Sequence, residues 1–351
     1  MSIDTVVLGA SGYVGGELLR LINAHPEFRL TAAVSTSRNG QFISSVFPHL
    51  ANNYADELFL GPDTWVDRIE SGANLALFSA APHGTSASIV AAALESTAQR
   101  NLNVHVVDSS ADFRYGSAAQ FESVYGIKHQ APELLGKFFC GVPEQVSDIG
   151  ATHAGHPGCF ATAVLLAAVP LAQSGLATSE MFVTAITGST GSGRSPQAGT
   201  HHPERHNNLY AYKALSHRHV PEIESLITKA CGREATVNFV PHSGPFARGI
   251  YVTLQARLAK ETPAGEIAEV FQTYYGNSPF VRFVDDVPRL KDIVVSNYCH
   301  LGATVRERTV VVMCAIDNLV KGSAGGAVQW MNRLWSLPET SGLLSAPPAW
   351  T

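Results

Sequence analysis

Cys159 has the clearest capacity for covalent chemistry, because it stands where a helix is expected to begin. It follows the turn-forming His156-Pro157-Gly158, and an apolar segment near Ala161 to Ala172 comes after it. A helix dipole favours a thiolate at its N-terminus, and the free backbone N–H groups there are able to hold an oxyanion. The pattern therefore predicts a nucleophile. The alternative, an inert buried thiol, suits Cys140 and Cys314, which lie in apolar runs.

Two histidines offer the proton transfers that a thiol nucleophile needs. The run His217-Arg218-His219-Val220-Pro221-Glu222 stands at the start of another expected helix. Imidazole titrates near neutral pH, so it is able to take a thiol proton and later to protonate an alkoxide. One of His217 and His219 is therefore the candidate acid/base. The competing interpretation places both side chains in solvent, in a loop that leads into the first helical turn at Pro221 and Glu222.

A glycine-rich turn near the start of the chain predicts a phosphate-binding site. The run Gly9-Ala10-Ser11-Gly12-Tyr13-Val14-Gly15 has the spacing G-x-x-G-x-x-G and lies between an expected strand and an expected helix. Glycines permit a tight turn and close approach of the backbone to a pyrophosphate, and the helix N-terminus supplies free N–H groups. The alternative is a tight turn without a ligand, because a glycine pattern alone is weak evidence.

The end of the second expected strand, Val34-Ser35-Thr36-Ser37-Arg38, indicates which dinucleotide binds. An NAD-dependent enzyme normally has an acidic residue here to hold the ribose hydroxyls. Ser35, Ser37 and Arg38 instead suit a 2′-phosphate, since a guanidinium donates two hydrogen bonds to it and a carboxylate repels it. The sequence therefore favours NADP. A polar surface loop with an incidental arginine is the alternative.

The histidine-rich run around His202 and His206 has a ligand-like spacing. Structural zinc sites require a fuller set of cysteine or histidine ligands at short spacings. Here Pro203 lies between the two histidines and no cysteine is near. We therefore predict no metal site.

The composition is that of an ordinary globular protein and argues against charged macromolecular partners. Of the 351 residues, 45% are hydrophobic and 15% are charged, which is enough apolar material for a substantial core. The net charge of -5, without a basic run, predicts no binding to nucleic acid or to an anionic membrane. The five cysteines form no CxxC pair, and the chain starts without an export-signal pattern, so we expect a reduced, cytoplasmic location.

The alternation of apolar runs with helix-period segments predicts an α/β protein of two domains. Strands are expected at residues 5–8, 30–34, 75–78 and 104–107, with helices at 16–24 and 86–99. This order is typical of a Rossmann-type parallel sheet. Later strands near residues 181–187, 236–240, 250–256 and 309–316, with a helix at 265–275, predict an α+β domain with a mainly antiparallel sheet.

The expected boundary lies just before the candidate nucleophile. We predict a dinucleotide-binding domain at residues 1–155 plus 320–351, and a catalytic and oligomerisation domain at residues 156–319. Within the second domain, a long segment rich in Gly, Ser, His and Pro reaches as far as Pro221. Irregular chain of that length is uncommon inside a compact domain and usually indicates function.

Taken together, the motifs resemble the N-acetyl-gamma-glutamyl-phosphate reductases of arginine biosynthesis, relatives of aspartate-semialdehyde dehydrogenase. The matching pieces run almost from end to end: GASGYVGGELLRL at Gly9, APHG at Ala81, DSSADFR at Asp108, GVPE at Gly141, HPGCFATA at His156, TGSTGSGR at Thr187, HRHVPEIE at His217, ARGI at Ala247 and AIDNLVKGSAGGAVQ at Ala315. The resemblance implies an NADPH-dependent enzyme that reduces a small acyl phosphate to an aldehyde through a thioester, and that assembles as a homodimer or homotetramer.

The resemblance also implies roles for individual residues. The catalytic residues are Cys159, His217 and Glu222. The cofactor-binding residues are Gly9, Ser11, Gly12, Tyr13, Val14, Gly15, Ser35, Ser37, Arg38, Pro82, Gly188, Ser189, Gly191 and Asn318. The substrate-binding residues are Arg114, His219 and Arg248. Arg114 pairs well with a phosphate, and a structural ion pair is the alternative role for it.

Two rival functions remain open on the sequence. The segment from Ser195 to His219 resembles reductases whose acyl phosphate is attached to an amino-group carrier protein in lysine or arginine biosynthesis. An acidic carrier requires a basic surface, and the acidic chain offers no obvious one. A dinucleotide-sensing regulatory protein without catalysis is the rival from another class, and the presence of a nucleophile and a candidate base argues against it. We expect the free N-acetylated substrate.

Overall fold

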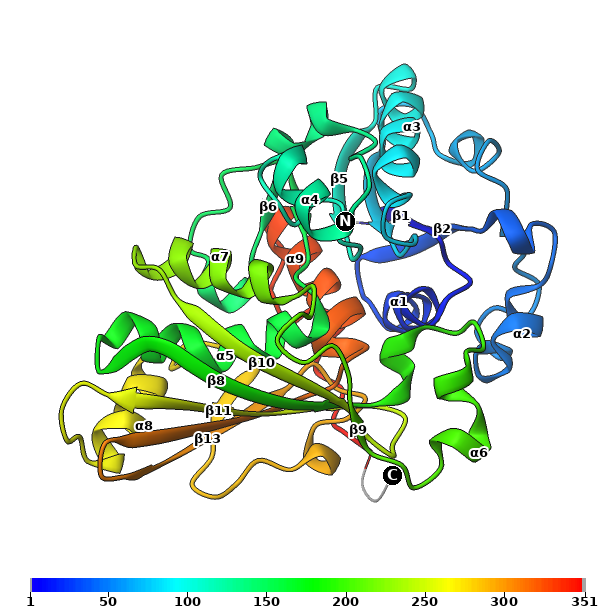
Figure 1. Ribbon diagram of the computed structural model, residues 1–351. Helices are drawn as coiled ribbons and strands as arrows, with labels where there is room; N and C mark the ends of the chain where they lie inside the picture. Colours follow the sequence, from blue (N-terminus) through cyan, green and yellow to red (C-terminus); the bar gives the residue numbers. More distant parts are fainter. Residues whose placement is uncertain (1, 349–351) are drawn as a thin grey trace. The chain divides into compact units, whose positions relative to one another are not determined.

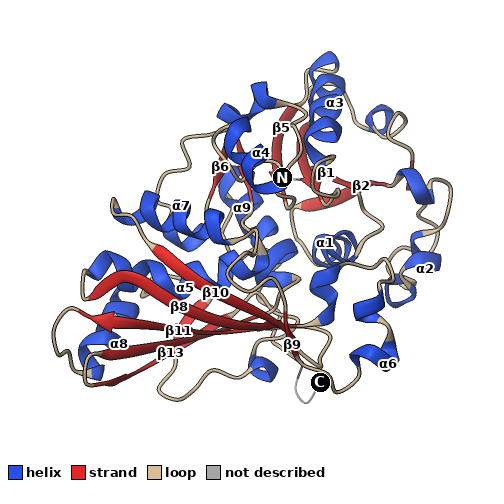
Figure 2. Ribbon diagram, viewed as in Figure 1, coloured by secondary structure: helices blue, strands red, loops and turns tan. Residues whose placement is uncertain are grey.

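The computed structural model describes residues 2–348, and it divides the chain into two compact units (Figure 1). The first unit comprises Met1–Cys140, Asp148–His156 and Ser323–Leu344. The second comprises Gly141–Ser147, Pro157–Gly322 and Ser345–Thr351. Each unit is built around its own sheet (Figure 2).

The first unit contains a fully parallel sheet in the order β3-β2-β1-β4-β5-β7-β6. Its strands are β1 Ile3–Leu8, β2 Phe28–Val34, β3 Phe59–Leu60, β4 Asn74–Ser79, β5 Asn103–Asp108, β6 Phe138–Cys140 and β7 His153–Gly155. Its helices are α1 Tyr13–Asn23, α2 Ile43–Val46, α3 Ser86–Gln99, α4 Ala118–Tyr125 and α9 Gly325–Leu334. The strands read as apolar runs because helices cover the sheet on both sides. The predicted Rossmann-type α/β architecture is confirmed.

The second unit contains a mixed sheet in the order β12-β13-β14-β11-β8-β10-β9. Its strands are β8 Ala177–Thr187, β9 Tyr210–Ala211, β10 Thr236–Ser243, β11 Ile250–Leu258, β12 Val281–Phe283, β13 Cys299–Arg306 and β14 Thr309–Ile316. Its helices are α5 Cys159–Ser174, α6 His202–Arg205, α7 Val220–Cys231 and α8 Ala264–Tyr274. The pairs β8–β10 and β12–β13 are parallel and the other pairs are antiparallel, so the predicted α+β domain has a sheet with both kinds of pairing.

Helix α5 forms the centre of the second unit and brings Cys159 to its first position. Every residue from Phe160 to Leu171 is buried, which explains why the segment is apolar on all sides rather than on one stripe. The helix ends at Gly175, whose φ of 70° is the left-handed conformation that glycine adopts without strain. Because the core around α5 is close-packed, the rest of the helix fixes the position of its first turn.

Candidate active site

In the first unit, the glycine-rich turn connects β1 directly to α1. Gly9 has a φ of 69°, and a Cβ there would lie 2.7 Å from the backbone nitrogen of Ala81. A Cβ at Gly15 would overlap the carbonyl oxygen of Ala10. Gly12, the N-cap of α1, is different because a Cβ there would meet nothing within 4 Å. The fold therefore requires glycine at positions 9 and 15. Packing within the protein does not require glycine at position 12.

The hydroxyl groups predicted to bind the dinucleotide cluster at the carboxyl ends of neighbouring strands. Ser35 Oγ donates to Ser11 Oγ at 2.9 Å and lies 3.5 Å from Ser37 Oγ. Arg38 is exposed, and its Nη1 donates to Gln41 Oε1 at 3.3 Å. Ligands of open α/β sheets bind at this end of the strands. Pro82 lies in the loop after β4, and Tyr13 and Val14 are the first two residues of α1.

In the second unit, Cys159 is the first residue of α5 and carries a reduced, partly buried thiol. The first N–H groups of a helix have no partner inside it, so they stand beside this thiol as donors. The preceding residue is held from outside the helix: Gly158 N donates to Glu222 Oε1 at 2.7 Å. Glu222 is buried in the first turn of α7. The structure thus links Glu222 to the turn that presents Cys159.

His217 and His219 lie together, with ring centroids 4.7 Å apart. Both rings contact Phe160, the residue after the nucleophile. Burial, followed by the charges of Arg218 and Lys213, lowers the pKa of His217 to about 4, so the ring is neutral near pH 7. Its Nδ1 accepts a hydrogen bond from His219 N at 3.2 Å, which assigns the proton of the neutral ring to Nε2.

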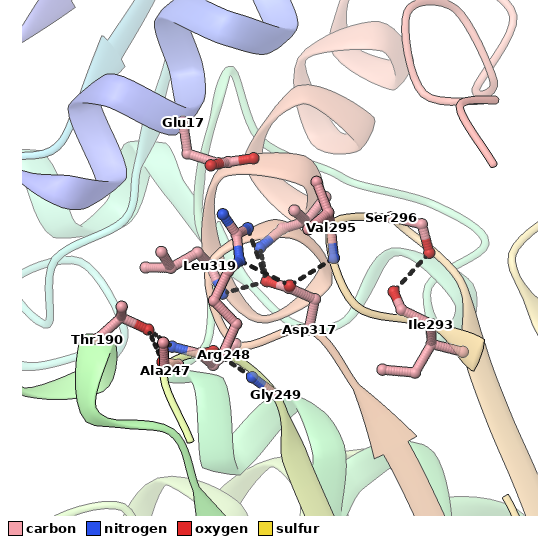
Figure 3. Close-up of polar contacts among 12 residues, drawn as sticks. Glu17, Thr190, Ala247, Arg248, Gly249, Ile293, Val295, Ser296, Asp317 and Leu319 are labelled. Carbon is pink, nitrogen blue, oxygen red and sulfur yellow. Dashed lines mark hydrogen bonds and ion pairs between the residues drawn. The ribbon is translucent and has the colours of Figure 1, made fainter. Parts of the chain in front are cut away.

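The glycine-rich loop after β8 is tied down by side-chain bonds. Thr190 Oγ1 donates to Ala247 O at 2.6 Å (Figure 3). It also accepts from Asn318 Nδ2 at 2.9 Å. The same amide accepts from Gly249 N at 2.7 Å through its Oδ1. Gly188, Ser189 and Gly191 belong to this loop. Asn318 therefore fixes the predicted nicotinamide loop against the start of β11.

Arg248 forms a two-pronged ion pair with Asp317 (Figure 3). Its Nε donates to Asp317 Oδ2 at 3.0 Å and its Nη2 donates to Asp317 Oδ1 at 3.1 Å. Two edges of this predicted substrate-binding guanidinium thus contact a carboxylate of the chain itself. Arg114 lies in the first unit, where its Nε donates to His156 O at 3.0 Å and its Nη2 to Ser109 O at 3.1 Å.

Three other polar features bear on the sequence motifs. His202 and His206 have ring centroids 5.1 Å apart, and residues 2–348 contain no group of three or more metal-ligating side chains. Asp112, in the DFR motif, accepts from Gly84 N and Ala87 N, so it caps the start of α3. Burial and the Cys159 thiol raise the pKa of Tyr212, a residue for which the sequence predicted no role.

The comparison with known families covers both units. A family model described as "Semialdehyde dehydrogenase, NAD binding domain" matches residues 4–147, and one described as "Semialdehyde dehydrogenase, dimerisation domain" matches residues 159–318. The predicted nicotinamide dinucleotide is confirmed by the first match. Among the helices that the structure describes, none is long and apolar enough to cross a membrane.

Two relatives that match along nearly the whole chain have the same description. The chain is 37% identical over 358 residues to a protein of Symbiobacterium thermophilum named N-acetyl-gamma-glutamyl-phosphate reductase, with 100% of both chains covered. It is 37% identical to a protein of the same name from Methanosphaera stadtmanae, with 97% of each chain covered.

Solved structures share the fold at low identity. Aspartate semialdehyde dehydrogenase II of Vibrio cholerae aligns with a TM-score of 0.68 at 14% identity over 96% of this chain and 98% of that one. The Candida albicans aspartate semialdehyde dehydrogenase with NADP aligns with a TM-score of 0.67 at 14% identity over 96% and 99% of the two chains.

Proposed function

The chain belongs to the N-acetyl-gamma-glutamyl-phosphate reductase family, and on that premise we propose that it reduces N-acetyl-gamma-glutamyl phosphate to N-acetylglutamate semialdehyde and phosphate with NADPH, a step of arginine biosynthesis. The observation that carries the chemistry is the position of the reduced Cys159 thiol at the first residue of α5. A thiol there is the type of nucleophile that an acyl phosphate requires.

The first half of the reaction forms a bond between the protein and the acyl carbon. Cys159 Sγ attacks that carbon as a thiolate, the carbon–oxygen bond to phosphate breaks, and a thioester remains. The first N–H groups of α5 stabilise the negative oxygen that develops during the attack. The hydrogen bond from Gly158 N to Glu222 holds the chain just before the nucleophile, so Glu222 acts as a positioning residue.

The second half reduces the thioester and releases the aldehyde. The hydride that the thioester carbon accepts would come from the nicotinamide dinucleotide when it is bound. The negative oxygen that results needs a hydrogen-bond donor, and neutral His217 has its N–H on Nε2 for that purpose. The thiohemiacetal oxyanion then re-forms the carbonyl of the aldehyde, the carbon–sulfur bond breaks, and Cys159 leaves as a thiolate. His219 is the candidate for accepting the thiol proton, because its ring contacts Phe160, the residue after Cys159.

The residues of the first unit fit NADP. The open space beside Gly12 suits a pyrophosphate that approaches the backbone at the start of α1. Ser35, Ser37 and the exposed Arg38 supply hydroxyl and guanidinium donors, without a carboxylate among them, at the position that meets the ribose. We assign these residues, with the other predicted members of the set, to the cofactor.

We propose that the chain self-associates as a homodimer or homotetramer in the cytoplasm. Helices α5, α7 and α8 cover one face of the second sheet, and the opposite face of β8 exposes Phe182 at 54% relative accessibility beside Thr184. An aromatic side chain on an uncovered sheet face favours an interface. The reduced cysteines fit a reducing compartment, which keeps the Cys159 thiol from forming a disulfide. Light scattering of the wild type and of Phe182→Glu measures this association.

The activity is tested with a substrate panel and NADPH. We expect turnover of free N-acetyl-gamma-glutamyl phosphate and loss of about 10³-fold or more in kcat for Cys159→Ser, because the weaker nucleophile no longer forms the thioester efficiently. Cys231→Ser is the matched control, since that thiol lies at the end of α7. Turnover of carrier-linked acyl phosphates alone would show that the rival substrate is the correct one. A fully active Cys159→Ser variant would show that no thioester forms on Cys159.

A further inference from the structure

Gly322, which is far from Cys159 in the sequence, packs directly against Cys159 in the fold. A Cβ added at Gly322 would lie 2.9 Å from the Cβ of Cys159 and 3.2 Å from its Cα. The first of these distances is shorter than side chains tolerate, and the atoms met belong to the base of the side chain and the backbone, which cannot swing away. The absence of a side chain at Gly322 is therefore a condition for the present position of Cys159.

Gly322 reaches this place through an unusual turn. Residues Val320–Ala324 form a π-helical turn, and Gly322 N donates to Asp317 O, five residues earlier, at 2.9 Å. Single π-helical turns are rare and occur frequently at functional sites. The wider turn brings the backbone, rather than a side chain, toward the nucleophile.

The carboxylate of Asp317 holds the start of this turn (Figure 3). Its Oδ1 accepts from the backbone N–H groups of Leu319 and Val320, both at 2.8 Å. Its Oδ2 accepts from Val295 N at 2.7 Å, and both oxygens bind Arg248. Asp317 is fully buried, so a charge in this place requires such complete hydrogen bonding. The turn is consequently fixed on several sides.

We propose that Gly322 is a positioning residue for the nucleophile: the turn anchored by Asp317 places a backbone without a side chain against Cα and Cβ of Cys159, and thereby sets the direction in which the thiol leaves α5. This inference rests on the proposed role of Cys159. Covalent catalysis requires the reacting atoms to be aligned closely, and a displacement of about 1 Å can cost about 10²-fold in rate.

The first experiment compares Gly322→Ala with wild type. We expect kcat to fall about 10- to 100-fold while KM for the acyl phosphate and the Kd of NADP change by less than about threefold, because the methyl group moves the sulfur and leaves the binding groups in place. The rate of Cys159 alkylation by iodoacetamide should change in the same variant. Gly265→Ala is the control, since Gly265 lies in α8 with nothing within 4 Å of an added Cβ. A folded Gly322→Ala variant with wild-type kcat and alkylation rate overturns the proposal.

A double-mutant cycle tests the contact without using activity. Cys159→Gly removes the Cβ that the new methyl group would meet, so the decrease in Tm caused by Gly322→Ala should shrink to less than half in that background. Equal decreases in both backgrounds, or failure to fold in both, count against the contact. Recovery of folding only in the Cys159→Gly background supports it. If the wild type were inactive but the effect of Gly322→Ala on Tm still shrank in the Cys159→Gly background, the proposed reaction would be rejected. The contact between Gly322 and Cys159 would still be supported.

Discussion

The turn after β1 and the surroundings of Cys159 both depend on glycine, but in different ways. In the turn, Gly9 and Gly15 avoid backbone atoms that lie close by in the first unit, and Gly12 faces open space. At Cys159, the required glycine is Gly322, which comes from the other end of the second unit's chain. The glycines of the turn after β1 are close together in the sequence, whereas Gly322 and Cys159 come together only when the chain folds.

The two regions also differ in how they hold unusual backbone conformations. Gly9 has a φ of 69°, which costs a glycine nothing. Val295 has a φ of 67°, which is strained for a β-branched residue. The carboxylate of Asp317 accepts the N–H of Val295, so the second region maintains strain with a buried charge. The following substitutions test this contrast.

Gly15→Ala should have the largest effect among them. The added methyl group overlaps the carbonyl oxygen of Ala10, and both belong to a backbone turn that cannot relax locally. We expect a loss of about 3 kcal/mol or more in the free energy of unfolding, measured by denaturant titration. Gly136→Ala, where an added Cβ meets nothing within 4 Å, serves as the control. A Gly15→Ala variant as stable as wild type would contradict the steric argument.

Gly12→Ala should separate ligand binding from folding. Nothing in the protein lies near the new methyl group, so stability should change by less than about 1 kcal/mol. The methyl group instead occupies the space proposed for the pyrophosphate, and we expect KM for NADPH to rise about tenfold, which corresponds to about 1.4 kcal/mol. An unchanged KM for NADPH would mean that the pyrophosphate does not approach this turn.

The fold of the first unit follows closely from the sequence because its signals are local. The strand, glycine turn and helix at residues 3–23 have apolar periodicity and turn residues that act over a few positions. The sheet of the second unit was predicted less completely. Strand β13 was not predicted, although Leu301, Ala303 and Val305 alternate with non-apolar residues. The parallel pairing of β8 with β10 was not predictable, because it depends on contacts between distant segments.

The candidate site shows the same division. The position of Cys159 at a helix start was predictable, because Pro157, Gly158 and the apolar run mark the boundary. The bond from Gly158 N to Glu222, the ion pair of Arg248 with Asp317 and the contact with Gly322 were not, since each joins residues that are remote in sequence. The only sequence signal for Gly322 was its place in the AIDNLVKGSAGGAVQ motif.

A buried histidine in each unit gives a pH test. Burial lowers the pKa of both His217 and His153 to about 4, from 6.5 in an unfolded chain. Between these values the unfolded chain binds the proton and the folded protein does not, so stability is lost as pH falls from 6.5 toward 4. His217→Gln and His153→Gln should each reduce the difference in Tm between pH 7 and pH 5. Only His217→Gln should also lower kcat, whereas equal kinetic effects would remove its catalytic role.

Val295→Gly should have the smallest effect. Glycine relieves strain of about 1–3 kcal/mol at this φ, and this gain offsets the lost packing of a partly buried side chain and the greater entropy of the unfolded chain. We therefore expect a stability within about 1 kcal/mol of wild type. The neighbouring Val294 is buried and has no positive φ, so Val294→Gly should cost roughly 2–4 kcal/mol.

The difference between these two variants measures what Asp317 supports. If Val295 were unstrained, its replacement by glycine would cost nearly as much as that of Val294, less only the difference in burial. A small cost for Val295→Gly instead means that the backbone of Val295 is strained in the wild type. The hydrogen bond from Val295 N to Asp317 Oδ2, at 2.7 Å, then offsets that strain. The same carboxylate anchors the turn that carries Gly322, so strain at Val295 is a consequence of the geometry that positions Cys159.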